Sequence, residues 1–196
     1  MRSFLRQFGK PSGLLGVLAG LYMLRVNRDL NAWGISLLEV GPADRVLEVG
    51  FGPGWAMRRL AKIAVDGLVA GMDHSALMVR QARRRNSAAV QAGRVALCLG
   101  SAAAIPLSDE SFDKVYSANS LSFWAEPIAC LWELRRAMKP GGTIVAALQP
   151  RRVNGQERKE IGEKVAGQMA CAGFRDVRLE FKDIRPVPAI CVVGLK

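Results

Sequence analysis

One short stretch limits the fold of this chain more than any other, the segment VLEVGFGPGWAM at residues 46–57. In it an apolar run reaches Glu48, glycines follow at positions 50, 52 and 54, and a helix-like segment begins. Glycines at such positions permit a tight turn from a strand into a helix and let a ligand approach the backbone closely. The stretch therefore predicts a strand, a ligand-binding turn and a helix in direct succession.

The spacing of these glycines differs from that of a dinucleotide-binding turn. Dinucleotide-binding folds use the pattern GxGxxG, which places the pyrophosphate at the helix N-terminus. Counted from Gly50 or Gly52, the third glycine is missing, because Trp55 and Met57 occupy its position. The pattern is instead ExGxGxG, with a carboxylate directly before the turn.

Beyond residue 45, short apolar runs alternate with helix-like stretches. The strand-like runs cover residues 45–50, 68–73, 95–100, 114–119 and 143–148, and the helix-like stretches lie near residues 54–65, 75–91, 126–138 and 156–172. A strand followed by a helix, repeated, predicts βαβ units and a parallel sheet. Two final runs, 174–181 and 187–194, predict an antiparallel hairpin at one edge. The expected fold class is α/β, a doubly wound, Rossmann-like, seven-stranded and mainly parallel sheet with an antiparallel edge strand.

At 196 residues the chain can bury the core of a single domain. We expect a short N-terminal helical extension or lid over residues 1–40 and the domain itself over residues 41–196. Residues 1–24 superficially match a signal peptide, but the uncharged run at residues 13–24 holds three glycines and no cleavage site follows. That run is also shorter than the roughly 20 residues that span a bilayer. We therefore expect helices packed on the domain, able to touch a membrane surface, in a cytoplasmic protein.

The cysteines and the single histidine exclude the common metal sites. No CxxC or Cys/His cluster occurs, and one histidine cannot form a His-rich site. Each cysteine stands alone in an apolar context, which predicts reduced, buried thiols. The four cysteines are Cys98, Cys130, Cys171 and Cys191.

The net charge of +11 is spread along the chain and is not concentrated in a tail. Basic residues outnumber acidic ones by 5 to 3 over residues 1–44, by 13 to 8 over residues 45–150 and by 10 to 6 over residues 151–196. Such an excess favours an anionic partner such as RNA, an acidic lipid surface or a phosphorylated metabolite. A solvated basic surface without a partner explains the charge equally well.

Further segments follow the glycine-rich turn in a characteristic order. They are GMDHS, with Asp73 at the end of the second predicted strand, then GSAAAIPLSDESFDKVYSANSLSFW, ELRRAMKPGGTIVAAL and AGFRDVRLE. Together with ExGxGxG they resemble the class I S-adenosylmethionine-dependent methyltransferases of the small-molecule type, over roughly residues 40–196. The resemblance implies S-adenosyl-L-methionine as cofactor and methyl transfer as activity.

The resemblance also implies which residues contact this cofactor. They follow the carboxyl ends of predicted parallel strands, where such sheets bind ligands: Glu48, Gly50, Phe51, Gly52, Gly54, Met72, Asp73, His74, Ser101, Ala102 and Asn119. The turn glycines would lie under the methionine part, with Glu48 near its amino group and Asn119 facing it. Asp73 would accept hydrogen bonds from the ribose hydroxyls.

The adenine end departs from the family pattern at one position. Met72 and His74 would flank the ring, and Ala102 would offer its backbone N–H to it. Many relatives carry Asp where this chain has Ser101, and a hydroxyl accepts a weaker bond than a carboxylate. The resemblance therefore implies looser adenine recognition here. A lone histidine such as His74 is also compatible with a purely structural role.

The acceptor substrate is less clearly indicated. Candidate acceptor residues are Tyr22, Trp33, Phe123 and Trp124, although core packing explains the last two nearly as well. The fourth predicted strand ends in ANSLSFW and lacks the Asn/Asp-Pro-Pro-aromatic sequence of nucleic-acid base amino-methyltransferases. A small-molecule acceptor, hydrophobic or lipid-like, is therefore favoured over nucleic acid.

No acid–base constellation is visible, so no catalytic residue and no metal ligand are assigned. An in-line displacement on a sulfonium needs mainly orientation and desolvation from the protein. Two alternatives stay open: an RNA methyltransferase, suggested by the charge, and a non-catalytic cofactor-binding or interaction protein. The run Arg83, Arg84 and Arg85 spans most of one helical turn, which favours a solvated face over a single ligand site.

Overall fold

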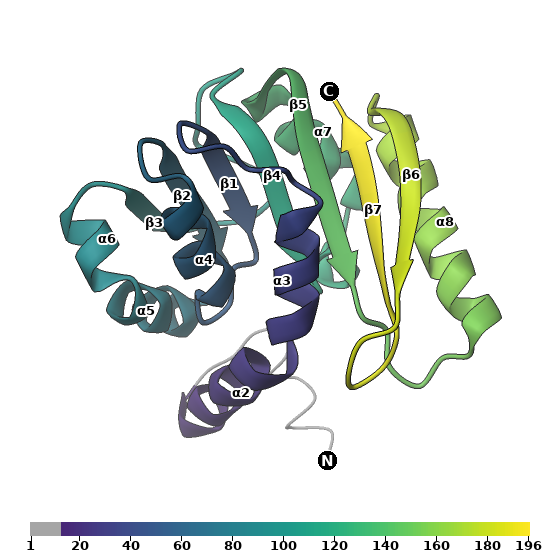
Figure 1. The fold of residues 1–196 in the computed structure, drawn as a ribbon, viewed down its shortest axis with the longest axis horizontal. Helices are drawn as coiled ribbons and strands as arrows, with labels where there is room; N and C mark the ends of the chain where they lie inside the picture. The colour runs from purple at the N-terminus through teal and green to yellow at the C-terminus, as the bar shows by residue number, and fades with distance from the viewer. Residues whose placement is uncertain (1–12) are drawn as a thin grey trace.

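The computed structural model describes residues 13–196, which form one seven-stranded sheet flanked by helices (Figure 1). The strands are β1 (Arg45–Val49), β2 (Leu68–Asp73), β3 (Val95–Leu99), β4 (Phe112–Ala118), β5 (Met138–Leu148), β6 (Arg175–Lys182) and β7 (Ala189–Leu195). The helices are α2 (Gly13–Val26), α3 (Arg28–Ser36), α4 (Trp55–Ile63), α5 (Ala76–Arg85), α6 (Ser87–Gln91), η1 (Leu121–Phe123), α7 (Pro127–Ala137) and α8 (Gly155–Cys171). The part of the predicted N-terminal extension at residues 1–12 lies outside the described residues.

The sheet has the order β3-β2-β1-β4-β5-β7-β6. Strands β1 to β5 pair in parallel, whereas β7 runs antiparallel to both β5 and β6. The predicted mainly parallel, seven-stranded α/β fold is confirmed. The C-terminal hairpin is also confirmed, and β7 is inserted between β5 and β6, so that β6 forms the edge. The strand order reverses between β1 and β4, where open α/β sheets bind ligands.

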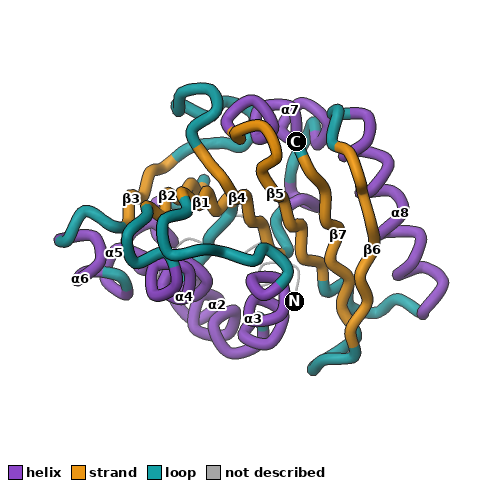
Figure 2. Tube along the Cα trace, turned by 45° about the horizontal axis from the view of Figure 1, so that its top comes forward, coloured by secondary structure: helices purple, strands orange, loops and turns teal. Residues whose placement is uncertain are grey.

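Helices lie on both faces of the sheet (Figure 2), and an apolar core fills the space between helices and sheet on each face. Successive residues of a strand point to opposite faces, so Leu47 packs towards α7 and α8 while Val46 packs towards α3, α4 and α5. On α3, Leu30 and Ile35 are buried in the second core, and Gly34 lets this helix lie close to Tyr116. Helix α3 is therefore anchored to the same sheet.

The stretch predicted as one helix over residues 75–91 forms two helices, α5 and α6. Ser75 caps α5 as expected, since its Oγ accepts a hydrogen bond from the Met78 backbone N–H at 3.4 Å. Asn86 ends α5, because its Nδ2 donates to the carbonyls of Ala82 at 2.8 Å and Gly54 at 3.1 Å. A side chain that takes up backbone carbonyls at this point competes with continued helix.

The cysteines differ from the prediction of four buried thiols. All four are unpaired, but only Cys130 and Cys191 are buried; Cys98 is half-buried and Cys171 is exposed. Cys171 is the last residue of α8 and lies on the helix face exposed to solvent. The apolar residues next to it in the sequence therefore do not indicate that it is buried. Among residues 13–196, no helix is long and apolar enough to cross a membrane.

Candidate functional site

The turn after β1 is built from glycines in a left-handed conformation. Gly50 has φ +74°, and a Cβ at this position would lie 2.2 Å from Ser120 Oγ, so only glycine admits the loop after β4. Gly52 has φ +53°, and its nearest neighbour would be Met23 Sδ at 3.9 Å. The space above Gly52 is therefore open, as a turn that contacts a ligand requires.

Gly54 serves a different purpose from the other two glycines. A Cβ at Gly54 would lie 2.7 Å from Ala82 Cβ and 2.9 Å from Asn86 Nδ2. The residue does not line a cavity, and it brings the start of α4 into contact with α5. Its backbone thus supports the turn without facing the ligand space.

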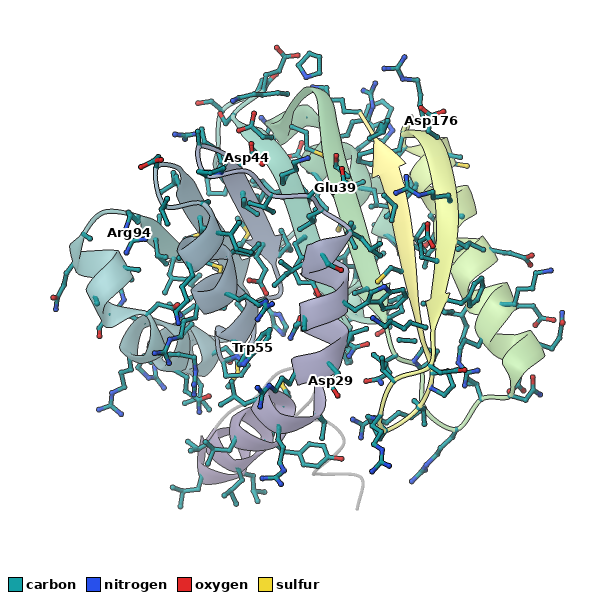
Figure 3. The ribbon with its side chains drawn as sticks, in the orientation of Figure 1. Asp29, Glu39, Asp44, Trp55, Arg94 and Asp176 are labelled. Carbon is teal, nitrogen blue, oxygen red and sulfur yellow. The ribbon has the colours of Figure 1, made fainter. Side chains whose placement is uncertain are left out.

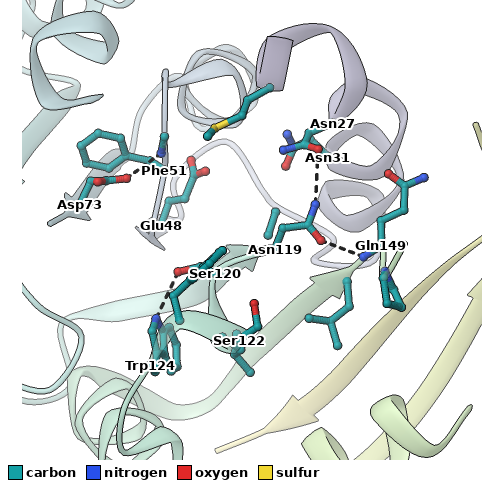
Figure 4. A pocket seen from close by; sticks show the side chains of 18 of the residues that line it. Asn27, Asn31, Glu48, Phe51, Asp73, Asn119, Ser120, Ser122, Trp124 and Gln149 are labelled. Atoms are coloured by element: carbon teal, nitrogen blue, oxygen red, sulfur yellow. Dashed lines mark hydrogen bonds between the residues drawn. The ribbon is translucent and has the colours of Figure 1, made fainter. Parts of the chain in front are cut away.

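Asp73 fixes the turn from the end of β2. Its Oδ2 accepts a hydrogen bond from the Gly52 backbone N–H at 2.8 Å (Figure 4). Its Oδ1 accepts one from the Ser75 N–H, also at 2.8 Å. Burial raises the pKa of this carboxyl, and the two backbone bonds and His74 oppose that rise. Because each carboxylate oxygen accepts about two hydrogen bonds, Asp73 retains capacity for hydroxyl donors of a ligand.

Glu48 is a buried carboxylate with one unsatisfied oxygen. Only 2% of the residue is exposed, and the Met57 backbone N–H in the first turn of α4 donates to it. This bond supplies the N-terminal cap that Gly54, which has no side chain, cannot provide. Oε2 has no partner among the described residues. Burial, reinforced by repulsion from Asp73, raises the pKa of Glu48 well above its usual range.

A cavity of about 990 Å³ opens at the carboxyl ends of β1, β4 and β5. Glu48 points into it from β1, between the Asp73 turn and Asn27 and Asn31 of the N-terminal helices (Figure 4). Trp55, at the mouth of this cavity, lies at the same end of the molecule as α2, whereas Asp44 lies at the opposite end (Figure 3). Pockets for one drug-sized ligand measure about 300–1,000 Å³, so this cavity lies at the upper end of that range.

A smaller cavity of about 120 Å³ adjoins the first beside the end of β2. It is lined by Met72, His74, Ser101 and Ala102, which the sequence resemblance assigned to adenine. The two cavities share residues that include Gly50 and Asp73. The structure therefore brings together the residues expected at the two ends of one extended ligand.

Asn119 joins the walls of the large cavity. It follows β4 with φ +51°, a left-handed conformation that asparagine tolerates better than most residues. Its Oδ1 accepts a hydrogen bond from the Gln149 backbone N–H at 2.8 Å, and its Nδ2 donates to Asn27 Oδ1 at 3.4 Å. The side chain thus links the end of β5 with the start of α3 across the cavity.

Comparison with known proteins agrees with this geometry. The family model described as "Methyltransferase domain" matches residues 47–146. The uncharacterised methyltransferase YdaC of Bacillus subtilis (strain 168) is 34% identical over 182 residues, which are 92% of this chain and 98% of that protein. The chain belongs to the class I S-adenosylmethionine-dependent methyltransferases.

Two further matches show how widely the likeness extends. A demethylmenaquinone methyltransferase of Symbiobacterium thermophilum is 34% identical over 53% of this chain and 42% of its own length. The chain thus spans less than half of this relative, in contrast to YdaC. The crystal structure of a SAM-dependent methyltransferase from Aquifex aeolicus has a TM-score of 0.71 at 21% identity, covering 88% of this chain and 91% of that one. This last likeness shows the fold.

The site of this methyltransferase fits S-adenosyl-L-methionine, its cofactor, on two structural observations. Glu48 Oε2 is a buried acceptor without a partner, and the cofactor carries a cationic amino group. The open space above Gly52 admits the cofactor next to the backbone, within reach of the Asp73 carboxylate. Glu48 and Asp73 are therefore the groups that would hold the amino group and the ribose.

The four candidate acceptor residues are distributed differently from the prediction. Phe123 and Trp124 line both cavities, and Trp124 Nε1 donates to Ser120 Oγ at 3.1 Å. Tyr22 and Trp33 line neither cavity. Tyr22 instead accepts a hydrogen bond from Arg151 Nη1 at 2.8 Å, and Trp33 packs on the second core.

Several cavity residues were missed in the sequence. They come from segments without a recognisable motif, namely Asn27 and Asn31 at the N-terminal helices, Gln149, Arg151 and Arg152 after β5, and Ile161, Lys164, Val165 and Gln168 of α8. The two asparagines stand four residues apart, and Asn31 Oδ1 accepts from the buried Tyr116 hydroxyl at 2.9 Å. Two asparagines at helical spacing, in a segment that also carries core-facing apolar residues, are the sequence pattern that could have indicated this wall of the cavity.

Proposed function

We propose that this methyltransferase transfers the methyl group to a small acceptor that is hydrophobic or lipid-like. The observation that carries the proposal is the part of the large cavity away from Glu48 and Asp73, whose walls are largely apolar. Those walls consist of Leu24 and Val26 of α2, Leu121 of η1, Leu148 at the end of β5, Pro150 in the loop after β5, and Ile161 and Val165 of α8. Apolar walls bind an apolar acceptor by removing both surfaces from water. The relative named a demethylmenaquinone methyltransferase supports such an acceptor.

The residues of the chain contribute mainly orientation and exclusion of water. When bound, S-adenosyl-L-methionine supplies a methyl group activated by the sulfonium. Glu48 and Asp73 hold the cofactor by its polar groups, while Phe123 and Trp124 line both cavities, next to the cofactor and the acceptor. Holding two reactants in line in a desolvated cavity removes much of the entropic barrier. No side chain is assigned as a general base.

An RNA acceptor is the second candidate, and the net charge of +11 is the observation in its favour. RNA binding through phosphates predicts an affinity that falls steeply as salt is raised. Filter binding of cellular RNA at increasing salt tests this alternative. Weak binding that is insensitive to salt would exclude it.

The decisive experiment is incubation of the protein with methyl-labelled S-adenosyl-L-methionine and separated fractions of a cell extract. We expect label in the lipid-soluble or small-metabolite fraction. Label in RNA would support the second candidate, and cofactor binding without label in any fraction would support a non-catalytic protein. The Gly52→Ala variant, with a Cβ in the ligand space, is the matched negative control.

A further inference from the structure

The charged side chains of the large cavity are separated by sign. Both acids that line it lie on strands, Glu48 in β1 and Asp73 at the end of β2. Three cations line it from the other side, Arg151 and Arg152 in the loop after β5 and Lys164 on α8. β4 lies between β1 and β5 in the sheet, and adjacent strands are about 4.8 Å apart. An acidic and a basic end therefore face one cavity, roughly 10 Å apart at the strand ends.

No carboxylate within residues 13–196 forms an ion pair with any of the three cations. Lys159, on the same helix as Lys164, is paired with Glu163 at 3.5 Å. Arg151 lies with its guanidinium 5.6 Å from the centre of the Tyr22 ring. All three residues are exposed, so they line the cavity where it opens to solvent, and their unpaired positive charge there attracts an anion.

Helix α8 presents Lys164 together with apolar side chains. Ile161, Lys164, Val165 and Gln168 all line the cavity, and their spacing of three and four residues places them on one helix face. Arg152 reaches the same cavity from a residue with φ +61°, a conformation that costs an arginine free energy and recurs at ligand-binding sites. The basic end is therefore continuous with the apolar walls.

We infer that the acceptor is an amphipathic anion, whose carboxylate or phosphate is held by Arg151, Arg152 and Lys164 while its apolar body lies along α2 and α8. This inference rests on the proposed function, because it names the chemistry of the acceptor in the same cavity. Arginine and lysine both recognise phosphate and carboxylate, arginine with two parallel hydrogen bonds. The acidic end remains for the cofactor, whose amino group needs a carboxylate.

The test compares three ligands with one ten-carbon chain: decanoate, decyl phosphate and decanol. Binding of each to the protein saturated with S-adenosylhomocysteine is measured by calorimetry at low salt. We expect both anions to bind about tenfold or more tightly than decanol, which corresponds to one charge-assisted hydrogen bond. The stronger of the two anions identifies the headgroup as carboxylate or phosphate.

The double variant Arg152→Gln with Lys164→Gln should lose most of the preference for the anions over decanol, since Arg151 is then the one cation left of the three, and should keep its affinity for S-adenosylhomocysteine. Lys159→Gln, on the same helix but outside the cavity, should behave as the native protein. Equal binding of decanol and the anions by the native protein would overturn the inference, as would an anion preference that is undiminished in the double variant.

Two outcomes separate this inference from the proposed function. A loss of S-adenosylhomocysteine affinity in the double variant would overturn the inference, because the cations would then hold the methionine carboxylate of the cofactor. Failure of the native protein to bind S-adenosylhomocysteine at all would contradict the proposed function. The comparison of anions with decanol, repeated on the protein alone, would still decide the charge preference.

Discussion

At the scale of the residue, the site contains two buried carboxylates whose ionised forms are costly. Glu48 and Asp73 both have a raised pKa, in each case chiefly because burial removes water from the charge. A cationic ligand beside Glu48 would offset that cost. The buried carboxylate therefore lowers the stability of the unliganded protein and increases its affinity for such a ligand. The same carboxylates therefore reduce stability and favour cofactor binding.

The variant Glu48→Gln tests this trade between stability and binding. Since the folded-state pKa is raised, the cost of the carboxylate is absent below its ordinary pKa and grows as pH rises through the folded-state value. Glutamine can still accept from Met57 and carries no charge. We expect a melting temperature a few degrees above the native protein at pH 8, with a smaller difference at pH 5, and weaker binding of S-adenosylhomocysteine.

Thermal unfolding at both pH values and calorimetric titration measure the two effects. Glu163→Gln, at an exposed position on α8, provides the control. It should change neither the pH dependence of the melting temperature nor the affinity for S-adenosylhomocysteine. A lower melting temperature for Glu48→Gln at pH 8 would show that the ionised carboxylate stabilises the fold.

The variant Asp73→Asn should lose cofactor affinity. One of its carboxylate oxygens becomes an amide group that cannot accept from the Gly52 or Ser75 N–H, and the charge that attracts the ribose hydroxyls is gone. We expect S-adenosylhomocysteine to bind about tenfold to a hundredfold more weakly in calorimetry. Asp66→Asn, in an exposed turn, is the matched control. Unchanged affinity in Asp73→Asn would remove this residue from the cofactor site.

At the scale of the element, the glycines of the turn after β1 have two different roles: Gly52 borders the ligand space and Gly54 packs against α5. Gly52→Ala should fold at a cost of about 1 kcal/mol from its positive φ and lose cofactor binding, because the new Cβ enters open ligand space. Gly54→Ala should instead lower stability by several kcal/mol, since its Cβ would overlap Ala82. Unfolding curves and calorimetry on the two variants distinguish these effects. Equal loss of stability in the two variants would contradict the assignment of Gly52 to the ligand space and of Gly54 to packing.

Helix α2 exposes an apolar face on the cavity side of the molecule. Leu14, Leu15, Leu18, Leu21 and Tyr22 are exposed, and Leu14 has 85% of its surface accessible. Arg25 follows in the last turn. Exposed apolar surface next to basic residues is typical of helices that lie in a membrane interface. The expectation of a membrane contact from the N-terminal segment stays a prediction.

Substituting Leu18 and Leu21 by serine tests this contact. Both side chains are more than half exposed, so the change should leave the melting temperature nearly unchanged. We expect sedimentation with phosphatidylglycerol vesicles to fall severalfold, because burial of two leucines in the interface is lost. The control is Val65→Ser, which removes an exposed apolar side chain away from α2. Equal sedimentation of the double variant and the native protein would exclude α2 as the contact.

The positions of strands and helices could be predicted from local sequence patterns. The division of one predicted helix into two, and the residues that line the acceptor side of the cavity, could not. The seven strands follow from apolar runs bounded by turn residues, and the ends of β2 and β4 fall within one residue of the prediction at Asp73 and Ala118. The division of the predicted helix at Asn86 was missed because its side chain bonds Gly54, 32 positions away. Arg151 and Lys164 line the same cavity as the cofactor residues only because β4 pairs with both β1 and β5 in the sheet.

At the scale of the whole molecule, the strand-order reversal between β1 and β4 explains why the site lies where it does. Loops from β1, β2, β4 and β5 converge at one end of the sheet, and the N-terminal helices close that end through Asn27 and Met23. The cofactor residues could be predicted because they occur in contiguous motifs. The acceptor side could not, because its residues are contributed by α2, the loop after β5 and α8.

A crystal structure of the protein with bound S-adenosylhomocysteine tests this division of the cavity most directly. The account predicts the adenine in the small cavity beside Met72 and His74, the ribose at Asp73 and the amino group at Glu48. The space bounded by Arg152 and Lys164 should remain free for an acceptor. A methionine carboxylate bound to those two cations, or a cofactor bound away from the Gly52 turn, would contradict the account.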